Sequence, residues 1–93
     1  MPFAFVQLDL ARNNIGDEGA KAVSEALAVN ASLTSLNLRK NGIRDEGAKA
    51  IGEALVVNAS LTSVDLTYNG IDDNAEAALR EAVKGRDGFS LSV

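Results

Sequence analysis

The chain has 93 residues and a formal net charge of −4 at pH 7, with 46% hydrophobic and 24% charged residues. This composition is typical of one soluble globular domain, and no run of about 18 apolar residues is present to cross a membrane. The sequence contains neither cysteine nor histidine, which excludes disulfides and thiolate chemistry and removes the commonest general base and metal ligand. We therefore expect a chain that is not an enzyme and has no cofactor, metal site or small-molecule substrate.

The net charge and the N-terminal residues limit the classes of partner and the cellular location that we expect. A negative net charge disfavours nucleic acid and anionic membranes, because both attract basic surfaces. Residues 1–8 have no basic region and only a short apolar run before Asp9, so they lack the features of a secretory signal. The sequence therefore predicts a cytoplasmic protein whose partner is another protein.

One sequence unit is repeated along the chain at a constant spacing. The Leu, Leu, Leu, Asn and Ile of the segment Leu33 to Ile43 recur with the same internal spacing from Phe5 and again from Leu61. Residues 13–40 and 41–68 are identical at 19 of 28 positions, which alanine-rich composition alone does not explain. We therefore expect a single domain, 1–93, with units of about 5–32, 33–60 and 61–88 and a terminal strand at 89–93.

Each unit is expected to begin with a strand. Polar and apolar residues alternate from Val6 to Leu10, so Leu8 and Leu10 should face inward. Equivalent strands are predicted at 34–38, 62–66 and 90–93, the last entered slightly earlier than the strict period. Because the strand exits of the three units place Asn13, Asn41 and Asn69 in register, we expect a structural ladder of hydrogen-bonded asparagines along the stack; alternatively, they are solvent-exposed turn residues.

A helix follows each strand, at about 17–29 in the first unit. Asp17 is predicted to be its N-cap, with Asp45 and Asp73 in the same role, because a carboxylate there accepts from the free amides of the first turn. Asn30 and Asn58 are predicted to close the first two helices in the left-handed conformation.

The third helix differs from the other two in carrying charged residues at the positions of Ala48, Gly52 and Val56. Such a polar outer surface is typical of the last unit of a repeat array. Each strand, helix, strand passage leads to a parallel neighbour, and right-handed crossovers are strongly preferred. The sequence predicts an α/β fold, a short right-handed solenoid with three helices outside a four-stranded parallel sheet.

The repeated pattern LxxLxLxxNxI, followed by a helix of the form DEGAKAxxEALxxN, resembles leucine-rich repeats of the ribonuclease-inhibitor subtype and is similar to the repeats of NOD-like receptors. The resemblance covers nearly the whole chain. It implies a horseshoe segment with the parallel sheet on the concave side, the helices on the convex side, and a role in binding proteins.

The outward positions of the concave sheet are the candidate protein-binding residues, because they differ between units while the core positions are constant. Alternatively, this face is merely solvated, since aromatic and arginine anchors are few. The candidates are Gln7, Asp9, Arg12, Ser35, Asn37, Arg39, Lys40, Ser63, Asp65, Thr67 and Tyr68.

The N-terminal end is a candidate for self-association, because Phe3, Phe5 and Val6 are apolar and no helix is predicted before the first strand. An open strand edge beside an apolar end favours a homodimer through this end; alternatively, the two phenylalanines fold back as a cap. The leading functional hypothesis is a non-catalytic interaction module. The alternative is a structural fragment of a longer array, or an engineered scaffold without an evolved ligand.

Overall fold

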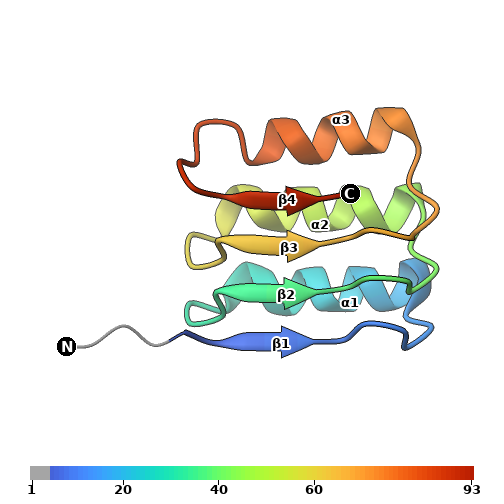
Figure 1. Cartoon of the computed structure of the whole chain (residues 1–93), viewed down its shortest axis with the longest axis horizontal. Coiled ribbons are helices and arrows are strands. Elements are labelled where there is room, and N and C mark those ends of the chain that lie inside the picture. The colour runs from blue at the N-terminus through green and yellow to red at the C-terminus, as the bar shows by residue number, and fades with distance from the viewer. Residues whose placement is uncertain (1–4) are drawn as a thin grey trace.

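The computed structural model describes residues 5–93 and contains four strands and three helices in strict alternation (Figure 1). Every strand lies inside its predicted range, and all pairs are parallel in the order β1-β2-β3-β4. The predicted α/β repeat solenoid is therefore confirmed for the described residues. The elements are β1 (Gln7–Asp9), α1 (Gly16–Val29), β2 (Ser35–Asn37), α2 (Asp45–Val57), β3 (Ser63–Asp65), α3 (Asp73–Ala82) and β4 (Ser90–Ser92).

The sheet register follows the sequence period. Leu8 pairs with Leu36 and Leu36 with Val64, a full repeat apart in each case, whereas Val64 pairs with Leu91, which lies just short of a full repeat further on. α3 has only 10 residues, against 14 and 13 in α1 and α2, but a longer connection from Ala82 to Ser90 makes up most of the difference. A turn through Gly85 and Gly88, with φ of 85° and 78°, then returns the chain to the sheet.

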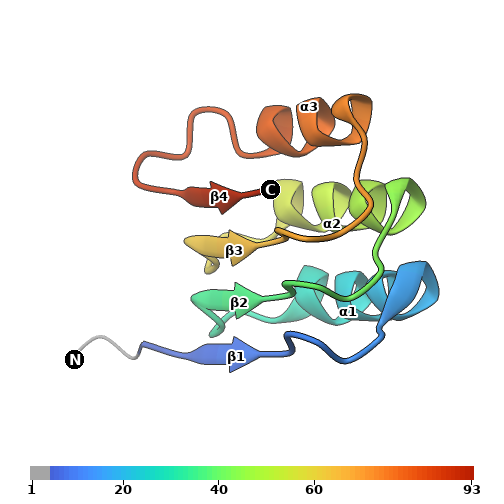
Figure 2. The ribbon, with the colours of Figure 1, turned by 45° about the vertical axis from the view of Figure 1, so that its right-hand side comes forward.

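The molecule has two layers, with the sheet on one side and the three helices on the other (Figure 2). Its core lies between them in the second and third units, where Leu36, Val64 and the facing Ile51, Leu55 and Leu79 are all at most 1% exposed. Stacked units therefore supply each other's interior, as expected for a repeat array that cannot bury its apolar face one unit at a time.

The first strand is less covered than predicted. Leu8 occupies the position of Leu36 but is 44% exposed, and Leu10 is only partly buried. The difference has a simple cause, because within residues 5–93 no unit packs against this side of unit 5–32. Phe3, predicted to lie at the same end, falls outside the described residues.

The aspartates at the helix starts are not the N-caps that the sequence predicted. Asp17 does not cap α1, whose N-cap position is Ile15; its Oδ1 accepts instead from the amides of Arg44 (2.8 Å) and Gly47 (3.0 Å), at the start of α2. The units pack so closely that a Cβ on Gly47 would lie 2.7 Å from this oxygen. The nearest free amides therefore belong to the next helix.

The same arrangement recurs one unit later, in a reduced form. Asp45 Oδ1 accepts from the amide of Asp72 at 3.0 Å. The third helix is capped by Asp72 itself, which accepts from the amide of Ala75 at 2.9 Å, whereas Asp73 is only the first helical residue. Sequence reasoning therefore placed the third cap one position too late.

The helix-end asparagines also differ from their prediction. Asn30 and Asn58 do follow α1 and α2, but their backbones are extended (φ −81° and −82°) rather than left-handed. Their side chains turn the chain instead, since Asn30 Oδ1 accepts from the amides of Ser32 (3.0 Å) and Leu33 (2.7 Å). A side-chain turn of this kind replaces the left-handed residue.

Candidate protein-binding surface

The asparagines at the strand exits link neighbouring units. Asn41 Oδ1 accepts from the amides of Asn13 (2.7 Å) and Ile15 (3.3 Å), and its Nδ2 donates to Leu10 O at 2.8 Å. Asn69 repeats the pattern with the amide of Asn41 at 2.9 Å. These bonds fix the strand exits relative to one another, and so they hold the sheet positions that precede them.

The three members of this ladder are not equally buried. Asn41 is 1% exposed, Asn69 is half-buried and Asn13 is exposed. The structure gives the side chain of Asn13 only donated bonds within its own unit, to Leu10 O at 2.9 Å and Ala11 O at 3.2 Å. The strength of the ladder therefore depends on position in the stack.

A second ladder, which sequence reasoning missed, runs along the opposite edge. Asn58, 3% exposed, donates through Nδ2 to Leu27 O and Asn30 O, both at 2.9 Å. Arg86 occupies the equivalent position of the next unit and donates to Leu55 O (2.8 Å) and Leu61 O (2.6 Å). The signal was in the sequence, because Asn30, Asn58 and Arg86 are spaced like the repeats and all carry side-chain donors.

The sheet face is polar, and its middle positions are partly engaged with the backbone. Asp9, Asn37 and Asp65 each accept at Oδ1 from the amide two positions later, at 2.9, 3.0 and 2.9 Å. These three predicted binding residues therefore also shape the strand exits. Thr67 joins them by donating its hydroxyl to Asp65 at 2.6 Å.

The remaining positions of the face are small or flexible polar side chains. Gln7 is exposed, and Ser35 and Ser63 are half-buried between neighbouring strands. Because the serine side chains are short, a ligand on this face can approach the sheet closely.

The residues that follow the strands share an uncommon backbone conformation. Arg12, Lys40 and Tyr68 occupy the same position in successive units, and all three have positive φ, at 61°, 55° and 58°. Tyr68 retains 71% of its accessible surface, and the other two side chains are also exposed. Non-glycine residues seldom adopt a positive φ because it is energetically unfavourable. The fold nevertheless imposes this conformation, and so it holds the three side chains at one edge of the sheet.

The structure brings two of the predicted residues into contact across units. The guanidinium carbon of Arg39 lies 4.3 Å from the centre of the Tyr68 ring. A contact of this kind is attractive, because the face of the ring is electron-rich, and it restricts the position of the guanidinium. The two side chains meet because the parallel register places the end of β2 beside the end of β3.

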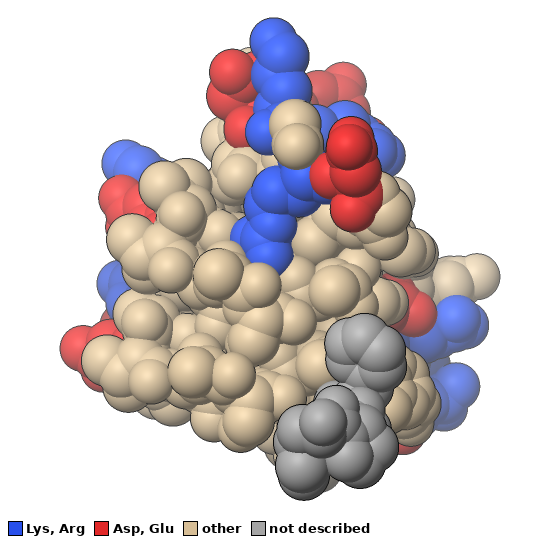
Figure 3. All heavy atoms as spheres, turned by 90° about the vertical axis from the view of Figure 1, so that its left-hand side faces the viewer, with Lys and Arg blue, Asp and Glu red and all other residues tan. Residues whose placement is uncertain are grey.

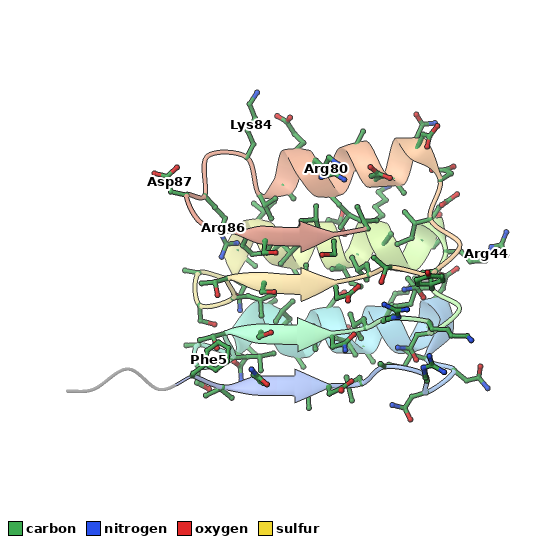
Figure 4. The ribbon with its side chains drawn as sticks, in the orientation of Figure 1. Phe5, Arg44, Arg80, Lys84, Arg86 and Asp87 are labelled. Carbon is green, nitrogen blue, oxygen red and sulfur yellow. The ribbon has the colours of Figure 1, made fainter. Side chains whose placement is uncertain are left out.

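The charge of the face differs from that of the chain. The predicted binding residues include three cations, Arg12, Arg39 and Lys40, and two carboxylates, Asp9 and Asp65, so their balance is +1 within a chain of −4. Arg44 projects from the same strand-exit edge (Figure 4). The remainder of the chain carries −5, so the excess of negative charge lies outside the predicted binding residues.

The N-terminal end presents an apolar surface to solvent. Phe5 is 68% exposed and Val6 36%, and Phe5 lies at the start of the first strand (Figure 4). Beside them, the core side of the first unit forms an open hollow of about 160 Å³ lined largely by leucine, valine and alanine, including Leu8, Leu10 and Leu27.

The edge formed by the helix ends and strand starts is largely uncharged (Figure 3). Val29 and Val57, at the ends of α1 and α2, are 86% and 63% exposed. Charged side chains gather instead around the third unit (Figure 3), where Lys84 and Asp87 point outward, whereas Arg86 turns back towards the preceding unit (Figure 4).

Features of other protein classes are not found within residues 5–93. This part of the chain has no cluster of three or more acidic or other metal-ligating side chains arranged to hold a metal ion. None of its helices is long and apolar enough to pass through a membrane.

The fold and the site define a repeat solenoid with a polar sheet face. The family model for the Leucine Rich repeat matches residues 5–24, 29–52 and 57–75. The chain therefore belongs to the leucine-rich repeat family, whose repeats generally mediate protein–protein interactions. A comparison with curated proteins finds no match.

Proposed function

We propose that this chain is a non-catalytic protein-interaction module that binds its partner through the concave sheet face. The observation that carries the proposal is the stacked pair Arg39 and Tyr68, at the strand exits of the sheet. Tyrosine and arginine are among the residue types that most often dominate binding energy in protein interfaces.

The rigid support of these residues favours the same function. Asn69 accepts from the amides of Asn41 and Ile43, and these bonds join the two strand exits that carry Arg39 and Tyr68. The backbone of the pair is therefore fixed before a partner arrives. A preorganised face loses little conformational entropy on binding. The unequal outward residues of the units then give the face its specificity.

The subtype and location form part of this proposal. The repeat length and the DEGAKA helix motif support the ribonuclease-inhibitor subtype, and similarity to NOD-like receptor repeats. We place the protein in the cytoplasm, with a protein as its partner and with no nucleic acid, membrane or small-molecule substrate.

The test is quantitative capture of partners from a native lysate with two matched double variants. The first, Arg39→Ser with Tyr68→Ser, removes the stacked pair from the sheet face. The second, Lys21→Ser with Lys49→Ser, alters two exposed residues on the helix face. Partners bound by the unaltered chain should be lost with the first variant and kept with the second; partners that survive the first variant contradict the sheet-face site.

Self-association through the N-terminal end is a second candidate, favoured by the exposed Phe5 and Val6 and by the adjoining hollow. The free edge of β1 offers unpaired backbone groups to a second copy. A two-fold dimer is the closed solution, because the charged third helix disfavours head-to-tail stacking. This arrangement also suits the alternative function of a structural repeat scaffold without an evolved ligand.

Sedimentation velocity distinguishes this second candidate. Phe5→Ser, alone and together with Phe3→Ser, should shift a dimer towards monomer, whereas Val29→Ser alters another exposed apolar residue, at the end of α1, and should leave the dimer intact. A monomer at high micromolar concentration of the unaltered chain would exclude self-association.

A further inference from the structure

The cations of the sheet face pair with no carboxylate within residues 5–93. The two ion pairs in this part of the chain join Lys21 to Glu18 and Arg80 to Glu76, both on helices. Arg12, Arg39 and Lys40 take part in neither, and the structure gives none of their side chains a hydrogen bond within the described chain. Along this edge of the sheet, Arg12 and Lys40 are therefore exposed without an acidic partner, and Arg39 lies against the Tyr68 ring.

The carboxylates nearest in the sheet are already engaged. Asp9 accepts from the amide of Ala11, and Asp65 accepts from both the amide and the hydroxyl of Thr67. Both engagements direct an acidic oxygen towards the protein's own backbone. Within the described residues neither carboxylate pairs with Arg12, Arg39 or Lys40.

The guanidinium of Arg39 is also oriented. Its carbon lies 4.3 Å from the centre of the Tyr68 ring, and its N–H groups make no hydrogen bond within the described residues, so they remain available to an acceptor. A carboxylate is the acceptor whose two oxygens match this edge, and such paired bonds are stronger than those between neutral groups. Lys40 and Arg12 add positive charge at the strand exits of the second and first units.

We propose that the partner of the sheet face presents an acidic segment, with one carboxylate seated against Arg39 and others near Lys40 and Arg12. This inference rests on the proposed sheet-face function and adds to it the chemistry of the partner. Carboxylates are favoured over the phosphates of a nucleic acid because the face has only three such cations in a chain of net charge −4, whereas nucleic-acid binders present extended basic surfaces.

The test measures binding of a short, fluorescently labelled Glu-rich peptide, its Gln counterpart of equal length, and a labelled single-stranded oligonucleotide. The Glu peptide should bind more tightly than the Gln peptide, and its affinity should fall with added salt. Arg39→Gln should weaken it by roughly tenfold or more, the loss expected for a charged hydrogen bond. Arg39→Lys keeps the charge but loses the paired geometry, and should recover only part of that loss.

Two further variants separate the stacked pair from general charge. Tyr68→Phe keeps the ring and should bind as the unaltered chain does, whereas Tyr68→Ala should bind more weakly. Lys21→Gln with Lys49→Gln removes two positive charges from the helix face, more than Arg39→Gln removes from the sheet face. It should have little effect on binding of the Glu peptide. Thermal unfolding of each variant confirms that it is folded.

Equal affinity for the Glu and Gln peptides overturns the inference, as does absence of Glu-peptide binding up to millimolar concentration. Tighter binding of the oligonucleotide also overturns it and assigns the cations to phosphate instead. These outcomes leave the interaction module intact if partner capture still depends on Arg39 and Tyr68. The interaction module itself is contradicted by a different result, in which the captured partners still bind after Arg39 and Tyr68 have been replaced.

Discussion

Replacing Asn41 by alanine tests the contribution of the strand-exit ladder to stability. The change removes the acceptor of the Asn13 and Ile15 amides, and the structure gives these amides no other acceptor within the described residues. The short 2.7 Å bond to Asn13 should contribute most. A donor left unpaired costs about 1 to 3 kcal/mol, so the two losses together should lower the free energy of unfolding by about 2 to 6 kcal/mol.

That loss is large for a chain of this size, whose whole free energy of unfolding is about 5 to 15 kcal/mol. Urea unfolding followed by circular dichroism measures it, provided that the slope with denaturant is unchanged. Asn13→Ala is the matched control, since it makes the same substitution at the exposed end of the ladder. It should cost less than about 1 kcal/mol. Equal losses for Asn13→Ala and Asn41→Ala would refute the argument from position in the stack.

Three further predictions concern packing, pH and the second ladder. Gly47→Ala places a Cβ within 2.9 Å of Ala20 and should destabilise by about 1 to 3 kcal/mol. Gly52→Ala, whose Cβ meets nothing closer than 3.7 Å, should stabilise by about 0.5 to 1 kcal/mol in the same urea assay. The amide of Ala75 and then the side chain of Asp45 hold the pKa of Asp72 below its ordinary value of 3.8. The lowered pKa means that ionised Asp72 stabilises the folded chain. This stabilisation is complete above the ordinary pKa and disappears as the pH falls through the lowered pKa. Thermal melts of Asp72→Asn should therefore show a smaller loss of stability in acid than those of the unaltered chain. Finally, Arg86→Ala leaves two carbonyls without their donor and should cost about 1 to 3 kcal/mol, whereas Arg80→Ala should change stability by less than about 0.5 kcal/mol, as for an exposed ion pair.

The strands, helices and register could be predicted because the repeat supplies three copies of one pattern. The shortened step to the last strand was predicted as well, because Phe89, Leu91 and Val93 alternate with serines. The family and the parallel sheet follow from features that are local in the sequence and repeated along it.

The partners of individual polar side chains were less accessible to sequence reasoning. Asp17 lies at the start of its own helix, so a local interpretation assigns it as the cap of α1, and only the stacked structure places its oxygen beside the amides of α2. The second ladder was missed for a similar reason, because Asn58 looked like a backbone-conformation signal while its Nδ2 reaches carbonyls about one unit back.

The sheet-face residues could be predicted only in part. Their place on one face follows from strand alternation, but the alternation does not indicate that Asp9, Asn37 and Asp65 bond to their own backbone. Nor does it indicate that Arg39 stacks on Tyr68, since side chains that meet across units lie far apart in the sequence. Contacts of this kind depend on side-chain conformation as well as on register, and a sequence pattern specifies only the register.

The carboxylate that reaches from Asp17 to the next helix makes the stack directional. Each such bond runs from one unit towards its C-terminal neighbour, so a helix start is completed by its predecessor. A duplicated block of one repeat length carries both the carboxylate and the amides that donate to such a carboxylate, wherever the block is cut. An array of this kind can be lengthened by tandem duplication of a whole unit without redesign of its joints.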